Sequence, residues 1–230
     1  MKKQVIVVGL GRFGVSLAAN MSEMGHDVLA LDTDEQKVQS ASGQMTHTVQ
    51  ADATNESVLR ELGAGNFDIA IVAIGTAVQN SVLATILLKR LGVPYVIARA
   101  SSDLHGEILD KIGADRVVYP EHTMGQILAH EAILGAVSEY MPVVSGYGIA
   151  KVEASPDFVG QTLSDLGVGP RGKLGVAVLI IQREKDIIVA PGQGELVKQG
   201  DTLIVAGNIE RLVDFLPKTK PDNDGRKRKT

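Results

Sequence analysis

The chain has 230 residues, with 23 basic and 27 acidic side chains and a formal net charge of −4. The last segment, 217–230, holds six basic side chains and two aspartates, a net charge of +4, which leaves the rest of the chain near −8. An acidic body with 3% aromatic residues argues against nucleic-acid binding, which needs a basic face and stacking platforms. Cysteine is absent, which excludes disulfides, thiolate zinc sites and thiol nucleophiles.

The first residues, MKKQ, run directly into an apolar strand and show no small-residue cleavage site. No apolar run reaches the ~18 residues of a membrane span. We therefore expect a cytoplasmic protein, for which any role at the membrane depends on a partner.

In chain order, β-branched runs alternate with helical periodicity over the first 120 residues. Four helical segments are followed by a glycine and then by a strand-like run, which is typical of a left-handed helix cap. These glycines are Gly25, Gly63, Gly92 and Gly113. The alternation predicts βαβ units with right-handed crossovers, and so an α/β fold with a Rossmann-like doubly wound parallel sheet. Its strands are expected near 4–8, 27–31, 46–50, 68–74, 95–99 and 116–118.

The pattern changes after Pro120. Residues 121–141 are predicted to form one long helix that Pro142 ends. Short strands and turns then predict a small β-rich lobe, with helical tracts near 161–167 and 208–216. We expect four parts in all: a nucleotide-binding domain at 1–120, a crossover helix and linker at 121–148, a β-rich C-lobe at 149–216 and a disordered tail at 217–230.

The stretch VIVVGLGRFG, residues 5–14, places a G-x-G-x-x-G motif between a predicted strand and a predicted helix. In this arrangement Gly9 allows a tight turn, Gly11 lets the backbone approach a pyrophosphate, and Gly14 lets helix and strand pack closely. The amides at the start of the helix would then carry the phosphates. The sequence therefore predicts a nucleotide site at this turn.

Three further side chains belong to the predicted site. Asp32 ends the second strand, where a carboxylate suits ribose hydroxyls and repels a 2′-phosphate, so NAD(H), ATP or ADP is favoured over NADP. Arg12 stands in the first helical turn, where a cation is unfavourable unless an anion is bound nearby; it either contacts phosphates or is a surface arginine. Asp52 ends the third strand and either approaches the adenine or, with Thr54 and Asn55, belongs to a helix cap.

Nothing in the sequence points to catalysis. The five histidines show no metal-binding spacing, and no nucleophile elbow or recognisable triad is present. A dehydrogenase would need a sizeable substrate domain, and only the small β-rich lobe remains. We expect a protein that senses its nucleotide without consuming it. An NAD-dependent oxidoreductase and a nucleotide-responsive sensor with another partner are the alternatives.

The chain resembles the cytosolic regulatory subunits of Ktr and Trk potassium uptake, the RCK family. The resemblance rests on VIVVGLGRFG, NFDIAIVAIG, KIGADRVVYPE and IIVAPGQGELVKQGDTLIVAGN, in this order, and covers nearly all of residues 1–216. It implies a nucleotide-binding N-lobe for ATP, ADP or NAD(H), a crossover helix packed between subunits, and dimers assembled into an octameric ring. It also implies a KtrB- or TrkH-like membrane channel as partner, at the inner face of the cell membrane.

The resemblance assigns site residues as well. Nucleotide contacts fall on Gly9, Gly11, Arg12, Phe13, Gly14, Asp32, Asp52 and Arg99, the last at a position where many members have lysine. Glu121 matches a glutamate that binds Mg²⁺, Ca²⁺ or Na⁺ between subunits; from the residues alone it is equally a helix N-terminal acid. Arg171 and Pro191 match a region that binds cyclic di-AMP in some relatives, although Ala177 replaces a common asparagine.

Overall fold

The computed structural model describes residues 1–134, 137–169 and 174–215. The chain forms two compact units, Met1–His122 and a second that begins at Thr123. Each unit has its own sheet; the first has a hydrophobic core on either face of its sheet, and the second has one core. The expected tail, 217–230, lies outside the described residues.

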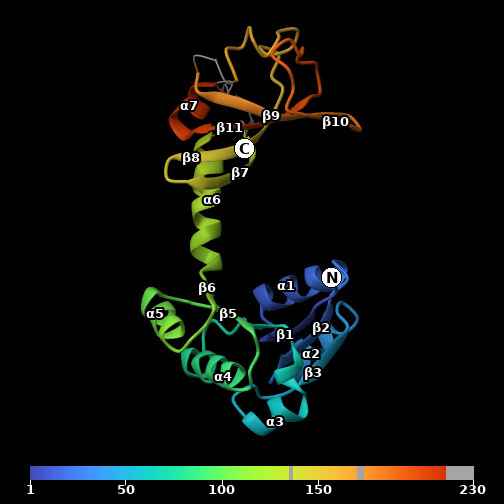
Figure 1. Ribbon diagram of the computed structural model, residues 1–230, viewed down its shortest axis with the longest axis vertical. Helices are drawn as coiled ribbons and strands as arrows, with labels where there is room; N and C mark the ends of the chain where they lie inside the picture. The colour runs from blue at the N-terminus through green and yellow to red at the C-terminus, as the bar shows by residue number, and fades with distance from the viewer. Residues whose placement is uncertain (135–136, 170–173, 216–230) are drawn as a thin grey trace, which may run out of the picture. The chain divides into compact units, whose positions relative to one another are not determined.

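The first unit is built on a parallel sheet of six strands in the order β3-β2-β1-β4-β5-β6. Figure 1 draws this unit in blue to green. All its pairings are parallel, so each strand is joined to the next by a crossover segment. This is the predicted Rossmann-like sheet, in which the strand order reverses between β1 and β4. The strands are β1 Gln4–Val8, β2 Asp27–Asp32, β3 His47–Gln50, β4 Ile69–Val72, β5 Tyr95–Arg99 and β6 Arg116–Val118.

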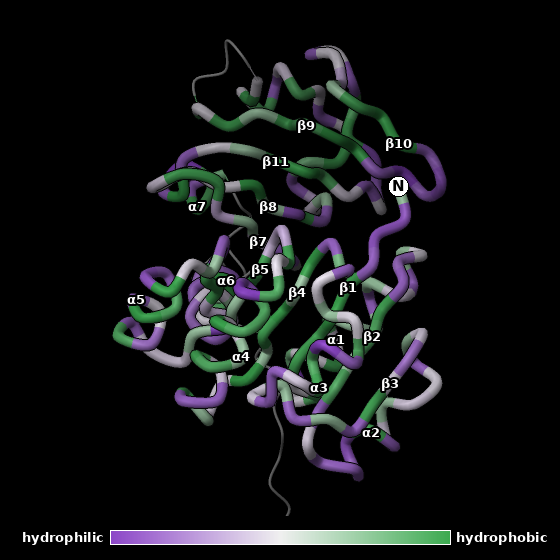
Figure 2. Tube along the Cα trace, turned by 60° about the horizontal axis from the view of Figure 1, so that its bottom comes forward, coloured by the Kyte–Doolittle hydropathy of each residue, from purple (hydrophilic) through white to green (hydrophobic). Residues whose placement is uncertain are grey.

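Helices connect these strands and cover the sheet. Residues on β1 and β4 are buried on both faces of the sheet, and Figure 2 shows these strands as hydrophobic stretches. One core cluster includes Ile6 and Val72, and another includes Val7 and Ile71, so consecutive strand residues feed two separate cores. The helices are α1 Arg12–Glu23, α2 Glu35–Ala41, α3 Glu56–Glu61, α4 Val78–Arg90 and α5 Asp103–Lys111, with a 3₁₀ turn, η1, at Ala64–Asn66.

The four predicted cap glycines end α1, α3, α4 and α5 as expected. Gly25, Gly63, Gly92 and Gly113 have φ between +69° and +95°. Each donates its N–H to the carbonyl three residues earlier, at 2.9 to 3.1 Å. Glycine adopts this left-handed conformation without steric cost, which explains why the residue recurs at these helix ends.

His105 is the one buried histidine of the first unit. It lies on α5 and is 1% exposed, and burial lowers its pKa. Its Nδ1 accepts the N–H of Ser101 at 3.2 Å, so the neutral ring carries its proton on Nε2. Among the described residues Nε2 has no hydrogen-bond partner. The fold therefore holds His105 in the uncharged form.

The second unit carries an antiparallel sheet of five strands in the order β10-β9-β11-β8-β7. The inner residues of these strands form its core with Phe158 and Phe215, whose rings stack at 4.8 Å. The strands are β7 Val137–Val144, β8 Tyr147–Glu153, β9 Val176–Arg183, β10 Asp186–Val189 and β11 Thr202–Asn208. The helices are α7 Ile209–Phe215 and α6 Pro120–Leu134, whose first three residues belong to the first unit. α7 lies within the helical tract expected near 208–216.

The predicted helix 121–141 is wrong in its last third. α6 ends at Leu134, and β7 begins at Val137 and contains Pro142. The strand exists because Val137 and Tyr140 are buried in the core of the second unit, opposite residues of β8. Pro142 fits there because β7 is an edge strand, where a missing N–H costs no interior ladder bond. The β-rich lobe therefore starts before the expected residue 149.

The predicted helical tract at 161–167 is also absent. Its amides bond to a distant segment: Leu163 N–H donates to the carbonyl of Glu195 at 3.0 Å, and Ser164 N–H to that of Gln193 at 2.9 Å. A single helical turn closes at Leu166. The pairing with residues 193–197 replaces the i to i−4 ladder that a helix would need.

One buried ion network fixes this part of the second unit. The Arg183 guanidinium donates to both carboxylate oxygens of Asp201, at 2.9 and 2.8 Å, and to Glu195 at 3.1 Å. The side chain of Asp201 is 0% exposed, and the hydrogen bonds from Arg183 hold the pKa of Asp201 below its usual value. Arg183 thereby ties β9 to the segment that leads into β11.

Candidate functional site

A glycine-rich turn joins β1 to α1 at the carboxyl edge of the parallel sheet. Gly9 has φ of +100°, and its N–H donates to the carbonyl of Leu31 at 2.8 Å. A Cβ at Gly14 would overlap the carbonyl oxygen of Gly9, so only glycine lets α1 pack this close to the turn. A Cβ at Gly11 would meet no protein atom within 4 Å. Gly9 and Gly14 therefore shape the turn, and Gly11 leaves its outer side open.

The start of α1 offers backbone donors to a ligand. Gly11 caps this helix of 12 residues, and the first turn contains no acidic side chain. The first N–H groups of a helix have no helical carbonyl partner, and the positive end of the helix dipole coincides with them. Gly11 also lines the cavity at this edge of the sheet. This combination suits a phosphate group.

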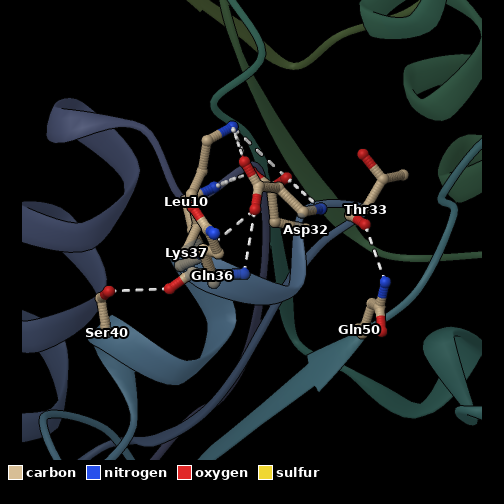
Figure 3. A network of polar contacts seen from close by, with 8 residues as sticks. Leu10, Asp32, Thr33, Gln36, Lys37, Ser40 and Gln50 are labelled. Carbon is tan, nitrogen blue, oxygen red and sulfur yellow. Dashed lines mark hydrogen bonds and ion pairs between the residues drawn. The ribbon is translucent and has the colours of Figure 1, made fainter.

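Asp32, at the end of β2, is held in place by backbone donors (Figure 3). Its Oδ2 accepts the N–H of Leu10 at 2.8 Å, and its Oδ1 accepts the N–H of Asp34 at 2.9 Å. The ammonium of Lys37 lies 3.4 Å from Oδ2. The side chain is 10% exposed and lines the cavity. A carboxylate fixed in this way can accept hydrogen bonds from ribose hydroxyls and repels a 2′-phosphate.

The cavity has a volume of about 310 Å³ and lies within the first unit. It is lined by the ends of β1 and β2, by the loops that follow β1 to β4, by Lys37 of α2 and Asn80 of α4, and by Arg99 at the end of β5. The strand order reverses between β1 and β4, and ligands of open α/β sheets bind outside the carboxyl ends of the strands at this reversal. Its size falls in the usual range of small-ligand sites, roughly 300–1,000 Å³.

Arg99 closes one side of the cavity. Its guanidinium carbon lies 6.0 Å from the centre of the Phe13 ring, and a Cβ at Gly75 would clash with the guanidinium. Its Nη2 donates to the carboxylate of Glu121, the second residue of α6. Its Nε is buried and has no hydrogen-bond partner among the described residues. Arg99 therefore connects the cavity to the first turn of α6.

Asp52 follows β3 and also lines the cavity. Its Oδ1 accepts the N–H and the hydroxyl of Thr54, at 2.8 and 2.7 Å. The cap of α3 is instead Asn55, whose side chain accepts the N–H of Ser57 at 3.0 Å. Of the two interpretations that the sequence leaves open for Asp52, the structure assigns the helix cap to Asn55 and places Asp52 at the cavity.

The structure brings some of the predicted site residues together and leaves others apart. Arg12 is exposed at the first position of α1 and does not line the cavity. Phe13 and Gly14 support the site from behind, by contacts with Arg99 and with Gly9. The predicted residues that do line the cavity are Gly9, Gly11, Asp32, Asp52 and Arg99.

Sequence reasoning missed Lys37 and the segment that follows β4. Gly75, Thr76 and Asn80 line the cavity from that segment. A signal for them existed: in a sheet whose order reverses between the first and fourth strands, the loop after the fourth strand must lie beside the glycine turn. No comparable signal existed for Lys37, because only the orientation of α2 brings its ammonium to Asp32.

Glu121, the expected cation ligand, does not line the cavity and pairs with Arg99. In the described part of the chain, no three His, Asp or Glu side chains gather as a metal site. Pro191 follows β10 and the positive-φ residue Ala190, and Arg171 lies outside the described residues. Within residues 1–134, 137–169 and 174–215, no helix is long and apolar enough to cross a membrane.

Comparison with known proteins gives matches over both units. The family model of the TrkA-N domain matches residues 5–120, and that of the TrkA-C domain matches residues 149–218. The chain is 41% identical over 215 residues to Ktr system potassium uptake protein C of Bacillus subtilis, covering 94% of this chain and 96% of that protein. It is 35% identical over 214 residues to Ktr system potassium uptake protein A of Vibrio alginolyticus, covering 93% and 96%.

Solved structures share the fold at lower sequence identity. The crystal structure of the GsuK RCK domain matches with a TM-score of 0.62 and 18% identity, over 96% of this chain and 49% of that one. The GsuK channel bound to NAD matches with a TM-score of 0.60 and 16% identity, over 96% and 41%. The resemblance first drawn from the sequence motifs is confirmed: the chain belongs to the family of Ktr and Trk potassium uptake proteins, which combine a TrkA-N with a TrkA-C domain.

Proposed function

We propose that this chain is a cytoplasmic regulatory subunit of a Ktr-type potassium uptake system, controlled by an adenosine nucleotide. The observation that carries the proposal is the cavity at the strand-order reversal, where the open side of Gly11 and the fixed carboxylate of Asp32 face one volume. In this proposal residues 1–120 form the nucleotide-binding lobe, α6 is the crossover helix, and residues 149–216 form the C-lobe, to whose sheet β7 adds the edge strand.

The proposed ligand is ATP, ADP or NAD(H). Amides at the start of α1 would hold the phosphates, and Asp32 would accept hydrogen bonds from the ribose hydroxyls. Arg99 supplies a guanidinium at the same cavity, suited to a phosphate by its fork of donors. Support comes from a structural neighbour, the GsuK channel, which is described as bound to NAD. The nucleotide would be released unchanged, so the protein would act without catalysis.

The proposed partner is a membrane potassium transport subunit, in keeping with relatives named as potassium uptake proteins. The ring formed by this chain would bind the nucleotide with one affinity when free and with another when bound to the membrane partner. Through this difference the nucleotide would control the partner. The proposal has three further parts. The chain forms an octameric ring, Glu121 holds a cation between subunits, and cyclic di-AMP binds near Pro191 and Arg171.

The proposal is tested by calorimetric titration of the purified protein with ATP, ADP and NADH, alone and with the membrane subunit in detergent. We expect binding of at least one nucleotide, with an affinity that changes when the membrane subunit is present. Equal affinities in the two states contradict the proposed mechanism, in which nucleotide binding to this chain gates the membrane subunit. Turnover of NADH contradicts the proposed absence of catalysis. Native mass measurement reports the ring size, and titration with cyclic di-AMP tests the second ligand.

A further inference from the structure

Arg99 lies between two sites where its positive charge can bind an anion. On one side it lines the cavity with Gly11 and Asp32, where the proposed function puts the phosphates of a nucleotide. On the other side its Nη2 donates to the carboxylate of Glu121 at the start of α6. A guanidinium can donate two parallel hydrogen bonds to one anion, either through Nε and Nη2 or through Nη1 and Nη2. Nη2 takes part in both arrangements, so a carboxylate bound to it occupies a donor that a phosphate would use.

The position of Arg99 is restricted, whereas Glu121 is free to leave. The Arg99 side chain is 20% exposed and lies against Gly75 and the Phe13 ring, so it has little room to follow either anion. The Glu121 side chain is 66% exposed and stands in the first turn of α6, where water can solvate it. An exposed ion pair of this kind is weak, because water and salt screen it.

We propose that Glu121 competes with the nucleotide phosphates for Arg99, so that nucleotide binding releases the first turn of α6. This inference rests on the proposed function, because it needs a phosphate in the cavity. It follows from charge: one guanidinium faces a carboxylate and a phosphate group, and the two anions repel each other. The phosphate carries the larger charge and gains the helix amides as well, so it displaces the carboxylate.

The consequence concerns the connection between the two units. Glu121 belongs to the first unit, and α6 continues from it into the second, which begins at Thr123. Breaking the pair between Arg99 and Glu121 removes a side-chain link between the nucleotide cavity and this helix. Nucleotide binding in the cavity would thus alter the contacts of the first turn of α6, where the first unit ends and the second begins.

The test is a double-mutant cycle of ADP affinity, measured by calorimetry on the full chain with EDTA present so that no divalent cation contributes. We expect Glu121→Gln to bind ADP about 2- to 5-fold more tightly than the unchanged protein, as the strength of an exposed ion pair predicts. In an Arg99→Gln background the same change should have no effect, because the contested cation is gone. Glu23→Gln, at the far end of α1, is the charge-matched control and should leave the affinity unchanged.

A second measurement follows the helix itself. Hydrogen exchange of the Met124 and Gly125 amides, which bond to the carbonyls of the first turn of α6, should become faster when ADP is added to the unchanged protein. In Glu121→Gln it should be fast from the start and insensitive to ADP. A structural role of Glu121 alone would not produce this loss of response.

The outcomes separate the two proposals. If the unchanged protein does not bind ADP, ATP or NADH, both the proposed function and the competition are refuted. If it binds ADP but Glu121→Gln binds equally or less tightly, the competition is wrong and the proposed function stands. An equal gain in the Arg99→Gln background also overturns the competition, because the effect would then be general repulsion that does not pass through Arg99.

Discussion

Replacing Asp32 with alanine should detach the turn after β1 from the end of β2. The change removes the acceptor of two backbone N–H groups, those of Leu10 at 2.8 Å and Asp34 at 2.9 Å. Because the Asp32 side chain is 10% exposed, water replaces the carboxylate only in part. An unpaired buried donor costs about 1–3 kcal/mol, and at the low end of this range the two donors together cost about 2 kcal/mol.

Amide hydrogen exchange measures this loss at the atoms concerned. If the two bonds open independently, exchange at Leu10 should become about 5-fold faster, and if they open together, about 30-fold faster. Asp32→Asn keeps one acceptor oxygen and should fall between the unchanged protein and the alanine variant. The amide of Ala30, within β2, reports any general destabilisation. The reasoning is refuted if the Leu10 amide of the alanine variant exchanges at the original rate, or if Leu10 and Ala30 change by the same factor.

The remaining predictions concern both units. Gly14→Ala should prevent stable folding of the first unit, since its Cβ would overlap a backbone carbonyl. Gly11→Ala should fold normally and lose at least tenfold in ADP affinity. Circular dichroism tests the folding and calorimetry the affinity, and normal ADP binding by Gly11→Ala would contradict the predicted phosphate position. Arg183→Met should destabilise the second unit by about 3 kcal/mol at pH 7, because it leaves the buried Asp201 carboxylate with only the N–H of Lys198 as a partner. Since the native pKa of Asp201 is lowered, its pair with Arg183 stabilises the fold above the unfolded-state pKa and this contribution fades as pH falls, so urea titrations should show a smaller difference in acid. Because the pKa of His105 is lowered, its ring is neutral in the folded protein and takes up a proton on unfolding in acid. The unchanged protein should therefore lose stability as pH falls below the ordinary histidine pKa of 6.5. His105→Gln should lose less stability over the same interval, and equal losses would contradict the buried neutral ring.

Local sequence signals predicted the first unit well because each signal has a local physical cause. A cap glycine such as Gly25 is fixed by the left-handed turn it must make, and a strand such as β1 by burial on both faces. The glycine turn and Asp32 were found for the same reason. The contacts of Arg99 depend on how β5 and α6 come together, which no spacing of residues reveals.

The second unit shows where local signals fail. The apolar spacing around Ile127 and Leu134 continues into Val137, so the helical period alone gave no reason to stop. The helix ends because the later residues pair with β8, a contact that is distant in sequence and outweighs local propensity. Residues 161–167 fail in the same way, since their amides pair with residues 193–197.

The proline in β7 also affects what can attach to the second sheet. Strand borders are templates for further strands, because they present unpaired donors and acceptors to any extended segment that approaches. Pro142 has no N–H to donate, and the register with β8 shifts beside it. Regular growth of the sheet by an added strand is therefore interrupted at this point, and a neighbouring molecule that binds along β7 must gain its affinity from side chains such as the exposed Met141 and Val143.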